Sequence, residues 1–149
     1  MGERVKANNM KITFASGYKY QLKKDYSVII PLDIPVDVIM GYIEIRRTTE
    51  KNLVNLIVKK GYAWDGPSGP TIDTLNFMRG SVEHDALYQL IRMGLFPETF
   101  RKIADLRLKE CCLEDGMSRL RAWIIYKGVR IMGAFATKAK NRRKWIVAP

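Results

Sequence analysis

The sequence predicts an α+β fold, with an N-terminal antiparallel β-meander followed by a three-helix half. Three observations lead to this prediction. Short β-branched and aromatic segments fill residues 1–62, a loop rich in glycine and proline spans 63–74, and apolar residues recur at helical spacing over 75–137. Because 149 residues form one domain most economically, we expect the sheet and the helices to share a single domain that ends in a basic tail at 138–149.

The predicted strands are short, and several alternate between apolar and polar residues. They are K-I-T-F, Y-K-Y-Q-L, S-V-I-I-P-L, G-Y-I-E-I-R-R and N-L-V-N-L-I-V. Turn-forming residues separate them, among them Ser16-Gly17, Pro35 and Asn52. This pattern predicts four or five antiparallel strands that follow one another in a meander.

The helical half contains three apolar patterns with helical spacing. The first helix is expected from about Leu75 to Met93, with Gly94 as its C-terminal stop. The second begins near Pro97, a residue favoured in the first turn, and the third begins near Ser118. Only a few residues connect the first two helices, so these two helices should be antiparallel neighbours.

The composition bounds what the protein can be. The start, M-G-E-R-V-K, lacks the apolar run of a signal peptide, so we expect synthesis in a cytoplasm. Lys127 and Arg130 interrupt the most apolar late stretch, so we expect no transmembrane segment. The only cysteines, Cys111 and Cys112, are adjacent on a predicted helix and are expected to be small buried hydrophobes. A zinc site is not expected, and any metal would be a hard cation held by oxygen.

The positive charge is concentrated at the C-terminal end. The net charge is +11, and no acidic residue follows Asp115 although nine lysines and arginines do. Such a stretch attracts the phosphates of nucleic acid or of anionic lipid, or an acidic groove on another protein. A solvated basic face with no specific partner explains it equally well.

The segment E-H-D-A-L-Y holds the only histidine of the chain, His84, and raises the question of a catalytic site. On a helix, Tyr88 lies one turn after His84, and Asp105 comes level with His84 if the next helix returns antiparallel. A carboxylate on one imidazole nitrogen leaves the other nitrogen as a base. Asp85, rotated by about 100°, faces the preceding loop, where it could hold calcium together with backbone carbonyls. The arrangement suggests attack by a water that His84 activates.

Three segments together resemble a phage and prophage family known as domain of unknown function 1353. They are W-D-G-P-S-G-P-T-I-D, E-H-D-A-L-Y and I-A-D-L-R-L-K-E-C-C. The family pattern is D-G-x-S-x-P, then H-D-x-x-Y, then A-D before a long helix that ends in R-A-W. The matching residues are Asp65, Gly66, Ser68, Pro70, His84, Asp85, Tyr88, Ala104, Asp105, Arg121, Ala122 and Trp123. The resemblance covers the second half of the chain and implies a phage origin, with synthesis in the host cytoplasm and incorporation into the virion.

The same three segments resemble the phospholipase A2 superfamily, in particular its compact form at the front of parvovirus capsid proteins. That resemblance implies a calcium-dependent hydrolase with His84 as general base, Asp105 as its orienting partner and Tyr88 as support for both. Asp85 would be a calcium ligand, and carbonyls near Trp64, Gly66 and Ser68 would complete the shell. The substrate would be a phospholipid ester, cleaved during host-envelope penetration or lysis, with the basic C-terminal third on anionic lipid.

A second interpretation remains open beside the enzyme. In it the protein is a structural virion or tail-associated component that keeps the scaffold without the reaction. Its basic end would then bind another virion subunit or nucleic acid. A lone histidine on a helix is often a structural one, and Asp105 could merely pair with Lys109 or Arg101 on a solvated face.

Overall fold

The computed structural model describes residues 12, 14–15, 20–65 and 74–136. Seven short strands precede one 3-10 turn and three α-helices. The strands are β1 (Phe14–Ala15), β2 (Tyr20–Leu22), β3 (Tyr26–Pro31), β4 (Val38–Met40), β5 (Ile43–Arg47), β6 (Leu53–Val58) and β7 (Ala63–Trp64). The helices are η1 (Glu98–Phe100), α1 (Leu75–Arg92), α2 (Arg101–Glu114) and α3 (Arg119–Ala136). The predicted α+β fold is therefore confirmed.

The strands form two antiparallel sheets. The larger one has the order β3-β6-β5-β4, and the smaller one has the order β1-β2-β7. Consecutive strands β4, β5 and β6 form the predicted meander, and β3 joins it by pairing with β6, with Tyr26 opposite Val58. Alternate residues of β3 and β6 are buried, so one face of this sheet carries the core. Trp64, which we had expected in the loop, lies in β7 opposite Tyr20.

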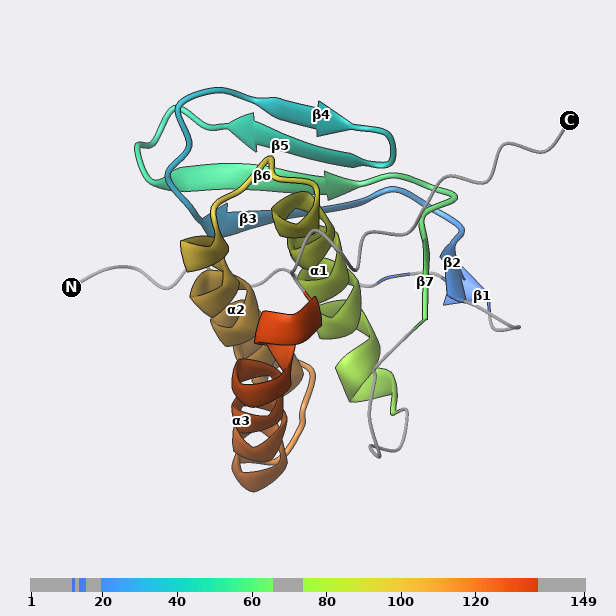
Figure 1. Ribbon diagram of the computed structural model, residues 1–149. Coiled ribbons are helices and arrows are strands. Elements are labelled where there is room, and N and C mark those ends of the chain that lie inside the picture. Colours follow the sequence, from blue (N-terminus) through green and yellow to red (C-terminus); the bar gives the residue numbers. More distant parts are fainter. Residues whose placement is uncertain (1–11, 13, 16–19, 66–73, 137–149) are drawn as a thin grey trace, which may run out of the picture.

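The three helices lie on one side of the larger sheet, as Figure 1 shows. α1 is nearest to the sheet, α2 returns alongside it, and α3 packs on the side of α2 away from the sheet. Gly80 lets α1 and α2 approach closely, because a Cβ there would lie 3.0 Å from Leu108 Cδ1 and 3.2 Å from the Leu108 carbonyl oxygen. Gly94 follows α1 with a φ of 74°, as its predicted role as a helix stop requires.

Two apolar clusters hold these layers together. The larger lies between the sheet and α1, with Leu56, Val82 and Leu90 among its fully buried members. The smaller lies among the helices and includes Cys112 and Ile125. Both cysteines are buried and unbridged, as predicted, and burial raises the pKa of Cys112 to about 12. Within the described part of the chain, no helix is long and apolar enough to cross a membrane.

Candidate functional site

The helix hairpin of α1 and α2 brings His84 and Asp105 together. Nε2 of His84 lies 2.7 Å from Oδ1 of Asp105. Because Asp105 is a carboxylate with no proton to give, the shared hydrogen belongs to Nε2, and Nδ1 keeps its lone pair. The His84 side chain is 15% exposed whereas Asp105 is fully buried. The predicted contact between His84 and Asp105 is therefore present, with the carboxylate fully buried and the imidazole side chain partly exposed.

Tyr88 supports this pair, at the position one turn after His84. Its hydroxyl donates to the same Oδ1 of Asp105 at 2.5 Å, and its ring lies 4.0 Å from the His84 ring, centroid to centroid. Burial, together with the bond to Asp105, raises the pKa of Tyr88, so the phenol stays protonated and remains a donor. Tyr88 therefore fixes the position of the carboxylate that orients the base.

Arg130 completes the environment of Asp105, from the third helix. Its guanidinium donates to Oδ2 at 2.8 Å, so both carboxylate oxygens are bonded. Burial alone would raise the pKa of Asp105, but the hydrogen bonds from His84, Tyr88 and Arg130 outweigh it and hold this pKa below its usual value. Asp105 thus stays ionised at neutral pH. Its negative charge can therefore stabilise the His84 imidazole when the ring gains a proton.

Gly133 explains how α3 comes close enough to cover the dyad. A Cβ at this position would overlap the Tyr88 hydroxyl, so the contact requires glycine. Arg101 donates from the start of α2 to the Arg130 carbonyl oxygen at 3.2 Å, and so ties α3 to the same place. Sequence reasoning missed both α3 residues. It treated Arg130 only as a charge within an apolar run, and the glycine three residues later was the remaining signal.

Asp85 points to the other side of α1, toward the strand that leads into the Gly/Pro loop. Its Oδ2 accepts a hydrogen bond of 2.8 Å from the Tyr62 hydroxyl, just before β7. Tyr62 directly precedes the predicted loop, whose residues 66–73 lie outside the described part of the chain. Trp64 lies in β7 beside it, with its indole N–H donating to Ser81 Oγ at 2.9 Å. The other two predicted calcium ligands, Gly66 and Ser68, lie outside the described residues.

Among the described residues, Asp85 is the predicted calcium ligand that offers a side-chain oxygen. Asp85 supplies one carboxylate, of which Oδ1 makes no hydrogen bond to a described residue. Such an oxygen is a suitable ligand for a hard cation, which needs several oxygens around it. Over residues 20–65 and 74–136 no group of three or more histidine, cysteine, aspartate or glutamate side chains could hold a metal. A calcium ion here would therefore depend on backbone carbonyls of the loop, as the sequence analysis expected.

A second group of charged side chains lies deeper, around Glu83. This fully buried carboxylate accepts from Arg107 at 2.9 Å, from the Tyr26 hydroxyl at 2.5 Å and from Cys111 at 3.1 Å. Arg79, also buried, bonds to Tyr26 and to the end of α2 through Asp115. None of the Glu83 side chain is exposed, and its partners come from β3 and α2. Glu83 therefore joins β3 to the helices and is a structural residue.

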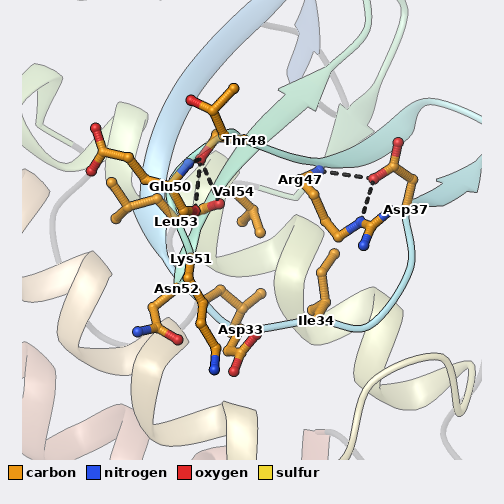
Figure 2. Close-up of a pocket in the computed structure, with 12 residues that line it drawn as sticks. Asp33, Ile34, Asp37, Arg47, Thr48, Glu50, Lys51, Asn52, Leu53 and Val54 are labelled. Atoms are coloured by element: carbon orange, nitrogen blue, oxygen red, sulfur yellow. Dashed lines mark hydrogen bonds and ion pairs between the residues drawn. The ribbon is translucent and has the colours of Figure 1, made fainter.

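Figure 2 shows a pocket at the end of the larger sheet, formed by the segments 32–37 and 47–54, with a volume of about 640 Å³. Two of its charged side chains, Asp37 and Arg47, form an ion pair of 3.5 Å. Asp37 accepts from the Arg47 backbone N–H at 2.9 Å, and Thr48 Oγ1 donates within its own turn. The pocket contains no histidine or cysteine and shares no residue with the dyad. The dyad is therefore the stronger candidate for chemistry.

The dyad is the feature that could act on a substrate, since it combines an oriented base with a partly exposed side chain. Comparisons of this chain with family models, with curated proteins and with solved structures find no match. The resemblance to the phage family and to phospholipase A2 thus stays a prediction. The feature of the molecule that bears on function is the geometry of His84, Tyr88, Asp105 and Arg130.

Proposed function

We propose that the protein is a phospholipase A2-like hydrolase in which His84 activates the attacking water. The observation that supports this proposal most strongly is the contact between His84 Nε2 and the buried Asp105, which also accepts from Tyr88. This contact leaves Nδ1 as the basic nitrogen of a side chain that is 15% exposed. Among the described residues no serine or cysteine is hydrogen-bonded to His84, so water is the simplest nucleophile.

The reaction proceeds in two steps. His84 Nδ1 removes a proton from water while the water oxygen bonds to the ester carbonyl carbon, which gives a tetrahedral oxyanion. This oxyanion then breaks the bond to the alkoxy oxygen, and His84 returns its proton to that leaving group. The products are a fatty acid and a lysophospholipid. Asp105 stabilises the imidazolium between the two steps, and Tyr88 and Arg130 keep the carboxylate charged and in place.

Calcium is part of this proposal, with Asp85 and backbone carbonyls near Trp64, Gly66 and Ser68 as its ligands. When bound there, the ion would polarise the ester carbonyl and stabilise negative charge on its oxygen. The hydrogen bond from Tyr62 supports the proposal because it holds the Asp85 carboxylate on the loop side of α1. The biological setting that fits is penetration of a host envelope or its lysis by a phage.

A vesicle assay tests the proposal. Purified protein is added to mixed phospholipid vesicles with calcium or with a chelator, and released fatty acid is measured beside the variant His84→Ala. We expect calcium-dependent release that the variant loses by about 10³-fold or more, since a general base contributes roughly 10²–10⁴-fold and its alanine replacement also removes the orienting contact. Absence of release from folded protein, together with absence of calcium binding, would refute the proposal and favour a structural virion component.

A further inference from the structure

The outer face of α3 is the largest feature that the dyad does not explain. Its exposed apolar side chains are Leu120, Trp123, Ile124, Ile131 and Met132, with exposed fractions of 69, 50, 53, 77 and 73%. Leu120, Ile124 and Ile131 fall within roughly 40° of one another at 100° per residue, so they form one stripe along the helix. Scattered single apolar residues are normal on a surface, but several exposed on one face of a helix mark an interaction site.

The opposite face of α3 packs against the other helices. Ala122 and Ile125 are buried against the other helices, and Val129 packs beside them. Arg130 and Gly133 contact the dyad on this inner side. The outer stripe is therefore not a displaced part of the core, because α3 already has a separate buried face.

The charges on α3 indicate what could cover the stripe. The helix contains four basic residues and no acidic one. Arg121 and Arg130 are committed to Thr74 and Asp105, whereas Arg119 and Lys127 are exposed. Lys127 Nζ lies 5.7 Å from the centroid of the Trp123 ring, and at 100° per residue Lys127 falls roughly 20° from Leu120, so this cation lies within the stripe with the indole beside it. Apolar residues with tryptophan beside lysine and arginine are typical of helices that lie in a membrane interface.

We infer that α3 docks the protein on an anionic bilayer, with the stripe among the lipid headgroups and acyl ends and with Arg119 and Lys127 on lipid phosphates. This inference rests on the proposed function and names the surface through which the enzyme would reach its substrate. A second copy of the chain is a poorer occupant, because pairing two such faces would bring basic residues together with no acidic residue on α3 to meet them. A helix is about 10 Å across, so the docked stripe would lie about that far from Arg130 and the dyad.

Binding is measured apart from catalysis. His84→Ala protein is sedimented with vesicles of phosphatidylcholine alone, or of equal parts of phosphatidylcholine and phosphatidylglycerol, at low and high salt. Binding should require phosphatidylglycerol and weaken with salt. Adding Ile124→Asp should reduce the partition coefficient by about tenfold or more. Adding Lys127→Gln instead should reduce it about fivefold, the effect expected for one cation near an anionic surface.

The matched control is Ile39→Asp, at an isoleucine of similar exposure (59%) on β4, which lies across the sheet from the helices in Figure 1. It should leave binding unchanged, and circular dichroism confirms that each variant is folded. Equal binding by the Ile124 and Ile39 variants would overturn the inference. So would a wild-type dimer in analytical ultracentrifugation that Ile124→Asp converts to monomer, since the stripe would then be a subunit interface. Binding of folded wild-type protein to the same vesicles with calcium, but without fatty acid release, would refute the proposed reaction and leave the docking surface intact.

Discussion

Asp105→Asn tests the electrostatic design of the site, because the substitution preserves shape and removes one charge. The carboxylate accepts from His84 and Tyr88 on one oxygen and from Arg130 on the other. An amide has only one oxygen, so its NH₂ group must face at least one of these donors. The variant therefore loses a charge-assisted bond worth about 1.5–3 kcal/mol and gains a donor–donor contact. Arg130 is 29% exposed and water recovers part of its loss, so we expect a net destabilisation of about 2–4 kcal/mol.

Urea unfolding at pH 7 measures this free energy. Tyr88→Phe removes one hydrogen bond to the same carboxylate and should cost less, about 0.5–1.5 kcal/mol. Asp37→Asn is the control, since that carboxylate also accepts hydrogen bonds but is 39% exposed, and it should change the free energy of unfolding much less than Asp105→Asn does. If Asp105→Asn lay within about 0.5 kcal/mol of wild type, the site would not depend on a buried carboxylate, and the reasoning would be wrong.

Three further predictions follow from the same contacts. The difference in free energy of unfolding between wild type and Asp105→Asn should depend on pH. Because the folded-state pKa of Asp105 lies below its ordinary value of 3.8, the stabilisation by the ionised carboxylate is present above that value and disappears as the pH falls below it. A difference that instead grows on acidification would contradict this. Glu83→Gln should lower the free energy of unfolding in urea by about 3–5 kcal/mol. The control is Glu110→Gln, which should lower it by less than about 1 kcal/mol, because the Glu110 carboxylate pairs with the same Arg107 but is 57% exposed. Equal costs would contradict the structural role of Glu83. Gly133→Ala should lower the free energy of unfolding by about 1–3 kcal/mol, and by less in a Tyr88→Phe background, because the overlapping hydroxyl is absent there. Strict additivity in this double-mutant cycle would show that the two residues do not interact.

The parts of the site that could be predicted from sequence are the local ones. Helical periodicity places Tyr88 one turn after His84, and the short connection after Gly94 makes α1 and α2 antiparallel neighbours. These two facts were enough to predict that Asp105 meets His84, which the 2.7 Å contact confirms. The same reasoning gave the flank of α1 on which Asp85 lies.

The parts that could not be predicted depend on tertiary packing. Periodicity alone does not tell which face of α3 turns inward, because this helix carries apolar residues on both sides and basic residues between them. Arg130 reaches Asp105 only because Gly133 lets α3 approach Tyr88. The pairing of β3 with β6, and the bonds from Tyr26 and Arg107 that bury Glu83, likewise join segments distant in sequence. Alternation of apolar residues predicts strands but not their partners.

Product analysis on one defined substrate tests the central claim most directly. Vesicles of a phosphatidylglycerol with different acyl chains at its two positions are incubated with the protein and calcium, and the released fatty acid is identified by mass spectrometry. Because phospholipase A2 enzymes cleave the sn-2 ester, we expect release of the sn-2 chain alone, with one lysophospholipid as the other product, and loss of both with folded His84→Gln. Release that His84→Gln leaves unchanged, or no release from folded wild-type protein, would contradict the assignment of His84 as the base.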